Sequence, residues 1–106
     1  ACGRCNWATC YDDRLFAEAL VRALMHEYCI DTSRVYLMGE SNGGMLIHRL
    51  ASEMPDTFAA VATVYALPLL GYAAGARGQA VRHAAQLRST ALLQLSARDD
   101  TIIPVA

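Results

Sequence analysis

The sequence predicts an α/β fold built on a parallel sheet, and two observations support this expectation. Apolar segments follow one another in the order helix, strand, helix, strand, connector, strand. Polar residues come directly after the first and third expected strands, where a parallel sheet gathers its functional groups. With 106 residues, 55% of them hydrophobic and 18% charged, the chain has the composition of at most one packed domain.

The first helix is expected from Asp12 or Asp13, either of which could cap it, to about Tyr28. Apolar residues recur every four positions along this segment and give it one apolar stripe: Phe16, Leu20, Leu24 and Tyr28. The residues "DTS" end the helix, and "RVYLMG" predicts a short strand from Arg34 to Gly39.

A second helix is expected from about Asn42 to Met54, because Pro55 ends it. Its apolar residues cover much of its circumference and predict a deeply buried helix. A second strand follows near Ala60 to Tyr65, and "ALLQLSA" predicts a third strand over 91–97. The connector 66–90 has a short helix expected over 79–87.

These elements give one incomplete domain over 1–106, with a Cys-rich loop at 1–11, a helix-strand-helix-strand unit at 12–65, the connector at 66–90, and a strand and acidic turn at 91–106. A three-stranded parallel core with flanking helices is therefore expected.

The charge pattern excludes some classes of partner. The formal net charge is −1 and no two lysine or arginine residues are adjacent, which disfavours electrostatic capture of nucleic acid or of an anionic membrane. The uncharged segment 58–76 contains Pro68, Gly71 and Gly75, so its first part predicts a buried strand rather than a membrane span. No cofactor is expected.

Four cysteines lie in the first third of the chain: Cys2, Cys5, Cys10 and Cys29. The spacing of "CGRC" occurs in redox and zinc sites, but there is no second cysteine pair or nearby histidine pair. Disulfides that hold a loop are favoured over a metal, and no metal site is expected. The pairing stays open, and Cys29 is expected in the core.

The segment Gly39-Glu40-Ser41-Asn42-Gly43 fits G-x-S-x-G, the nucleophile elbow, between an apolar strand and a helix. So sharp a turn leaves no room for side chains two residues to either side of the serine, and Gly44 allows close approach of the helix. Ser41 is then an exposed nucleophile and the backbone N–H of Asn42 an oxyanion donor. The alternative is that Ser41 is only a helix N-cap.

A serine nucleophile needs a histidine base and an acid that orients it, in the chain order serine, acid, histidine. Asp99 and Asp100 follow the third strand, where the acid belongs, and only one of them can serve. His26 and His48 are expected to be packing or surface residues, and His83 has only a remote chance of reaching the site. The catalytic histidine is thus expected to be absent from the chain.

The segments "DDRLFAEALVRAL", "IDTSRVYLMGESNGGMLIHRLASEMPDTFAAVATV" and "LLQLSARDDTIIP" resemble the polyhydroxybutyrate depolymerase and feruloyl esterase family of α/β-hydrolases. The resemblance covers roughly 70 residues and implies Ser41 as nucleophile, Asn42 as oxyanion donor and Asp100 rather than Asp99 as acid, since the family has an aspartate four residues before a proline. It also implies a histidine beyond Ala106, ester substrates and, often, secretion.

The chain departs from the family pattern at Ser96-Ala97, where His-Gly is usual, and at Val105, where tyrosine is usual. The leading hypothesis is a serine ester hydrolase that acts through an acyl-enzyme on a small or polymeric ester and favours an extracellular location. The alternatives are a serine peptidase of the prolyl oligopeptidase type, a non-catalytic module of the same fold, and a thiol or metal function at "CGRC". Residues 1–106 alone are expected to be marginally stable and inactive.

Overall fold

A computed structural model describes residues 12–67 and 90–103 of the chain. It divides into two compact units, residues 1–30 and residues 31–106, and each is described by itself. The expected helix at 79–87, His83, Pro68 and the cysteines at positions 2, 5 and 10 lie outside the described residues.

The first unit contains helix α1 (Asp13–Glu27). Asp12 is its N-cap, because its carboxylate accepts hydrogen bonds from the backbone N–H groups of Arg14 and Leu15 at 3.1 and 3.2 Å. The helix thus begins at one of the two predicted capping positions and ends one residue before Tyr28. Its apolar residues are mostly exposed, and Cys29, expected in the core, is an exposed free thiol beyond the helix.

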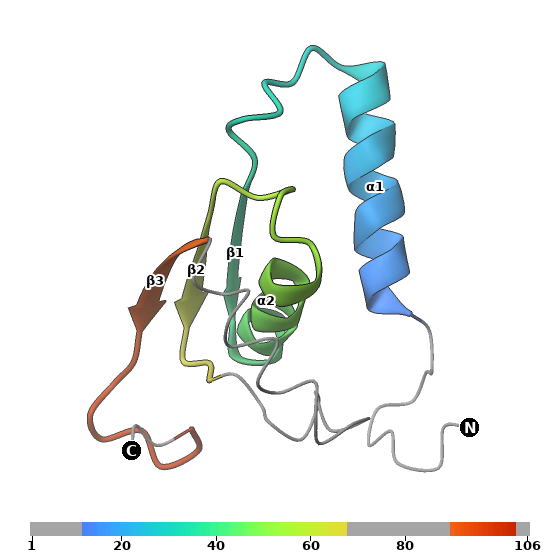
Figure 1. The fold of residues 1–106 in the computed structure, drawn as a ribbon. Helices are drawn as coiled ribbons and strands as arrows, with labels where there is room; N and C mark the ends of the chain where they lie inside the picture. The colour runs from blue at the N-terminus through green and yellow to red at the C-terminus, as the bar shows by residue number, and fades with distance from the viewer. Residues whose placement is uncertain (1–11, 68–89, 104–106) are drawn as a thin grey trace. The chain divides into compact units, whose positions relative to one another are not determined.

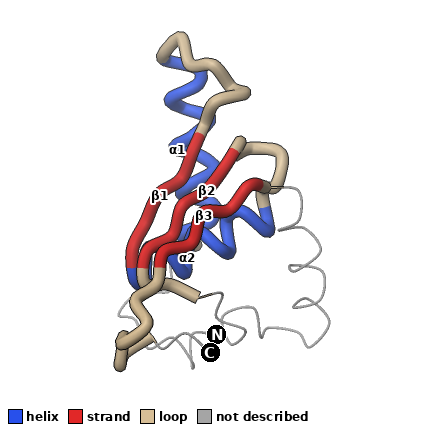
Figure 2. Tube along the Cα trace, turned by 90° about the vertical axis from the view of Figure 1, so that its left-hand side faces the viewer, coloured by secondary structure: helices blue, strands red, loops and turns tan. Residues whose placement is uncertain are grey.

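The second unit is a parallel sheet with one helix on one face (Figures 1 and 2). The strands β1 (Tyr36–Glu40), β2 (Ala60–Val64) and β3 (Ala91–Leu95) lie in the order β1-β2-β3. The register pairs Glu40 with Val64 and Val64 with Leu95, so all three strands end on the same rung. The predicted three-stranded parallel core is confirmed, with β2 at its centre.

Helix α2 (Ser41–Glu53) connects β1 to β2 and packs on the sheet. Ile47, Leu50 and Ala51 of the helix are buried, as are Val61 of β2 and Phe58 just before it. Burial of this apolar face removes several large side chains from water, at roughly 1.5–3 kcal/mol each, and stabilises the helix against the strands. The predicted deep burial of this helix is confirmed, and its C-cap is Met54, directly before Pro55.

The opposite face of the sheet is exposed within the described residues. Side chains alternate along β1, so that Leu37 and Gly39 point to the side of α2 while Tyr36 and Met38 point away from it. Met38 is 78% exposed, and Leu93 of β3 is exposed on the same apolar face. No helix of the described part of the chain is long and apolar enough to cross a membrane.

The first strand begins two residues later than the sequence predicts, because a turn occupies the segment before it. The carboxylate of Asp31 accepts hydrogen bonds from the backbone N–H and hydroxyl of Ser33 and from Nε of Arg34, at 3.0, 2.6 and 2.7 Å. The backbone N–H of Arg34 also donates to the carbonyl of Asp31 at 3.0 Å. These bonds hold Arg34 in the turn and keep it out of the sheet.

Candidate active site

Ser41 lies at the junction of β1 and α2 in a left-handed backbone conformation, with φ of 49°. A residue with a side chain loses about 1–2 kcal/mol in this region, so the surrounding structure must impose the conformation. Ser41 is exposed, and within the described residues its hydroxyl makes no hydrogen bond. The serine is therefore strained and accessible, and its hydroxyl has no hydrogen-bond partner among the described residues.

Two glycines make this junction sterically feasible. A Cβ on Gly39 would lie 2.8 Å from Cδ1 of Ile47 and 2.9 Å from the carbonyl carbon of Gly43. A Cβ on Gly44 would lie 2.5 Å from Cβ of Ala66, so only glycine allows α2 to approach the chain beyond β2 this closely. The steric reason predicted for Gly43 is wrong, since a Cβ there meets no atom within 4 Å among the described residues.

The N-terminus of α2 carries no side-chain cap. The N-cap position belongs to Glu40, whose side chain makes no capping hydrogen bond, and the first turn has no acidic residue. The interpretation of Ser41 as a simple N-cap therefore does not describe this helix. The first backbone N–H groups of a helix lack intrahelical partners, and that of Asn42 is among them. Together with the helix dipole they form a region that favours negative charge.

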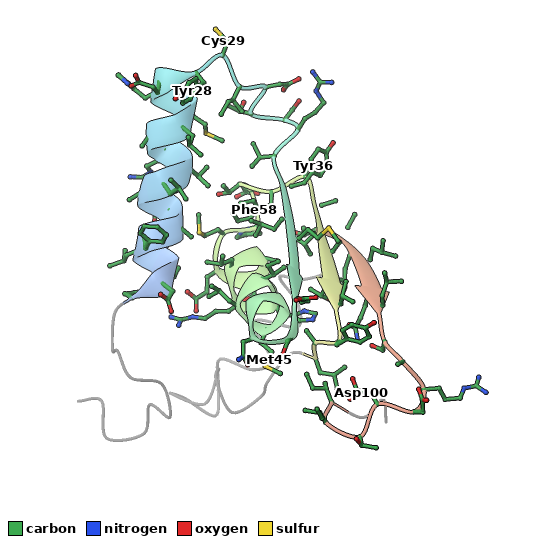
Figure 3. The ribbon with its side chains drawn as sticks, turned by 180° about the vertical axis from the view of Figure 1, so that it is seen from behind. Tyr28, Cys29, Tyr36, Met45, Phe58 and Asp100 are labelled. Carbon is green, nitrogen blue, oxygen red and sulfur yellow. The ribbon has the colours of Figure 1, made fainter. Side chains whose placement is uncertain are left out.

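Asp100 lies in the turn that leaves β3, beyond the carboxyl end of the strand (Figure 3). Its Oδ1 accepts hydrogen bonds from the backbone N–H groups of Ile102 and Ile103, at 2.8 and 2.9 Å. The hydrogen bond from Ile103 and, to a smaller extent, the one from Ile102 lower the pKa of Asp100 below its usual value. The second carboxylate oxygen makes no hydrogen bond within the described residues, so the group is held as an anion with one oxygen available.

Asp99 differs from its neighbour in that no hydrogen bond holds its carboxylate within the described residues. It is also more exposed than Asp100. Of the two candidate acids, the fold orients only Asp100.

Strand order fixes the separation between the ends of the strands that precede the serine and the acids. Ser41 follows β1 and the aspartates follow β3, with β2 between them. Adjacent strands lie about 4.8 Å apart, so the ends of β1 and β3 are about 10 Å from each other. The serine and the acids thus follow strands that are two positions apart in the sheet and that end at the same edge.

Two histidines, His26 and His48, lie within the described residues. His26 is on α1, in the other unit, and His48 is buried on α2, only 4% exposed. Neither ring nitrogen of His48 has a hydrogen-bond partner within the described residues. Burial lowers the pKa of His48, an effect that the nearby backbone of Ala66 partly opposes, so the ring is held neutral. Residues 12–67 and 90–103 contain no group of three metal-ligating side chains.

A second strained residue at this edge of the sheet was not predicted from the sequence. Tyr65, directly after β2, also has φ of 49°, and Ser41 and Tyr65 are the two non-glycine residues with positive φ in the described chain. Tyrosine has no preference for this conformation, so neither composition nor periodicity could have identified it.

The chain is similar to one family of proteins and to several individual proteins. The model of the prolyl oligopeptidase family matches residues 6–70, more than half of the chain. A feruloyl esterase B of Thermothelomyces thermophilus is 44% identical over 64 residues, which are 60% of this chain and 22% of that protein. The putative esterase NocK of Nocardia uniformis subsp. tsuyamanensis is 49% identical over 49 residues, which are 46% of this chain and 14% of that protein.

A feruloyl esterase B of Neurospora crassa is 42% identical over 48 residues, or 45% of this chain and 16% of that protein. The chain thus spans less than a quarter of the length of these relatives. No solved structure matches it. The esterase relatives and the parallel sheet support an α/β-hydrolase of esterase-like type. By the match over residues 6–70, the chain belongs to the prolyl oligopeptidase family.

Proposed function

We propose that this chain supplies the nucleophile and the acid of a serine carboxylic-ester hydrolase. Ser41 Oγ attacks the ester carbonyl carbon while a histidine removes its proton, and the tetrahedral oxyanion accepts a hydrogen bond from the backbone N–H of Asn42. The alcohol leaves with the proton from the histidine, and water then releases the acid from the acyl-enzyme. The histidine is supplied by a part of the protein outside the described residues.

The observation that carries this proposal is the left-handed backbone of Ser41 at an uncapped helix N-terminus. A strained, exposed serine whose hydroxyl makes no hydrogen bond within the described residues is costly for a structural residue and useful for a nucleophile. The backbone hydrogen bonds to Oδ1 of Asp100, which lower the pKa of its carboxyl group, support the proposal that this carboxylate stabilises an imidazolium.

The esterase names of the three relatives favour carboxylic esters as the substrate class. Within that class, a feruloyl-type ester or a polyhydroxyalkanoate is the substrate that the resemblance of the sequence implies. An extracellular location is proposed on the same resemblance and on the cysteine content.

The test uses the full-length protein that carries this chain. Ser41→Ala is expected to lower kcat/KM for an aryl ester at least about 10³-fold, because the nucleophile is removed. Ser52→Ala is the matched control: it removes a hydroxyl from the same helix, one that donates to the carbonyl of Arg49 at 2.8 Å, and should retain activity within about twofold. Full turnover by Ser41→Ala would rule out the assignment.

A serine peptidase is the second candidate, and the match to the prolyl oligopeptidase family favours it. The two activities share the nucleophile and differ in the leaving group. Turnover of an aryl ester and of a peptide anilide should therefore be compared in the same protein. A kcat/KM for the anilide that exceeds the value for the ester would favour the peptidase.

A non-catalytic module of the same fold predicts neither activity. Labelling with a fluorophosphonate distinguishes this alternative, because only an activated serine reacts. Labelling of the wild type but not of Ser41→Ala is expected, and absence of labelling of the wild type would favour the non-catalytic module.

A further inference from the structure

We propose that Tyr65 is a substrate-contacting residue, whose ring forms one wall of the ester site beside Ser41 and determines affinity for substrates with an apolar ring. This inference rests on the proposed function and extends it to a residue that the sequence analysis did not identify. It depends on the position of Tyr65 in the sheet, on its backbone conformation and on its exposure.

The position follows from the register of the sheet. Glu40 of β1 pairs with Val64 of β2, so Ser41 and Tyr65 are each the first residue beyond the same rung. Neighbouring strands lie about 4.8 Å apart, and the two residues therefore leave the sheet side by side at its carboxyl edge. The acid turn follows the next strand along, which places Tyr65 between the strands of the nucleophile and the acid.

The backbone of Tyr65 is held from two sides. Its N–H donates to the carbonyl of Leu95 at 2.9 Å and continues the ladder between β2 and β3. The next residue, Ala66, is fully buried, and its Cβ lies against Gly44 of α2. The chain must therefore turn sharply under the helix at this residue, and a positive φ achieves this turn.

The turn explains the positive φ but not the tyrosine. Glycine adopts this conformation without steric cost, and asparagine tolerates it, whereas a bulky aromatic residue in it is a genuine outlier. Packing covers only part of this residue, because Tyr65 remains 47% exposed. A strained aromatic residue that leaves much of its surface in solvent at a catalytic edge is better explained by contact with a ligand.

The chemistry of the ring indicates what it contacts. An exposed phenol presents an apolar face and a polar tip, and aromatic faces pair best with other rings in offset or edge-to-face arrangements. The partner is accordingly an ester with a ring in its acyl or alcohol portion. A small ester without a ring reaches Ser41 but gains little from Tyr65.

The experiment compares three substitutions in the full-length protein. Tyr65→Gly and Tyr65→Asn remove the ring and suit the left-handed backbone, while Tyr65→Phe keeps the ring as the matched control. The substrates are methyl 3-phenylpropanoate, with a ring in the acyl group, benzyl acetate, with a ring in the alcohol, and methyl acetate, with none. Steady-state kcat and KM are measured for each, together with the thermal midpoint of each variant.

For at least one ring-bearing ester, KM is expected to rise about three- to tenfold in the glycine and asparagine variants, with kcat changed less. In Tyr65→Phe, the KM for these esters should stay within about twofold of the wild-type value. The KM for methyl acetate should not change with any of the three substitutions. The glycine variant should melt no lower than the wild type, because it relieves the strained backbone.

Two results would overturn the inference. Unchanged KM for both ring-bearing esters would show that the turn into Ala66 alone determines this residue. Unfolding of both the glycine and the asparagine variants would show that the ring is needed for packing. Failure of the proposed function is distinguishable, because it appears as turnover that survives Ser41→Ala, whatever the Tyr65 variants do.

Discussion

The strain at Ser41 can be measured by replacing the residue with alanine and with glycine. Both substitutions remove the hydroxyl, but only glycine is free of the steric cost of φ of 49°. Alanine retains the cost of the left-handed region, about 1–2 kcal/mol. Glycine avoids it but loses about 0.5–1 kcal/mol of backbone entropy on folding. Ser41→Gly should therefore be more stable than Ser41→Ala by roughly 0.5–1 kcal/mol.

Ser52 provides the matched comparison on the same helix. It lies in the last turns of α2 with negative φ, and it is buried. Glycine in a helix interior is about 1 kcal/mol less stable than alanine, and burial of the missing methyl group adds to that difference. The order of the two variants should thus be reversed between positions 41 and 52.

The assay is urea unfolding of the four variants of the full-length protein, read from midpoints and slopes. Esterase activity should be lost equally in Ser41→Ala and Ser41→Gly, since neither has the nucleophile. If glycine is less stable than alanine by the same margin at both positions, the backbone of Ser41 is not strained and the reasoning from its conformation fails.

Three further predictions concern other residues of the second unit. Gly44→Ala should lower the free energy of unfolding by about 1–3 kcal/mol, because the new Cβ would lie 2.5 Å from the Cβ of Ala66. Gly43→Ala places its Cβ in open space and should be neutral or stabilising by up to about 1 kcal/mol. Urea midpoints test both variants, and equal losses of stability would refute the packing argument. Asp100→Asn should lower kcat/KM about 10⁴-fold, because the amide can accept the same backbone hydrogen bonds but lacks the negative charge. Asp99→Asn should change kcat/KM little. A larger loss in Asp99→Asn than in Asp100→Asn would assign the role of the acid to Asp99. His48 binds a proton more weakly in the folded chain, so the free energy of unfolding should fall as pH drops below about 6.5, where His48 of the unfolded chain becomes protonated. His48→Leu should reduce this pH dependence between about pH 7.5 and 5.5. An unchanged slope of the unfolding free energy against pH would contradict the prediction.

The sequence predicted those parts of the fold that depend on local patterns. The apolar pattern around Leu50 and the proline after Met54 were sufficient for α2, because periodicity and a chain-breaking residue act within one helix. The end of β3 was misjudged by two residues, since Ala97 accepts a hydrogen bond from the N–H of Asp100 and is already part of the turn. The end of a strand depends on whether its last backbone groups form hydrogen bonds within the sheet or within the following turn, and the pattern of apolar residues does not predict this choice.

The candidate site was predictable only where a motif constrains the backbone. G-x-S-x-G identified the position of Ser41, because glycine at position 39 is required by the close approach of Ile47. The positive φ of Tyr65 and the burial of the His48 ring depend on tertiary contacts of Ala66 and the chain around it. Such contacts join residues far apart in sequence and leave no periodic signal. Cys29 was misjudged because apolar neighbours in sequence do not guarantee burial at a helix end.

The central place of β2 has a consequence for how this edge tolerates change. One strand, β2, separates the end of β1 from the end of β3, and the hydrogen bonds of the sheet set this separation, not the length of any connection. Insertions and deletions between β2 and β3 should therefore leave the separation of the two strand ends intact, and the two candidate site residues that follow them can be combined with connections of very different size and chemistry.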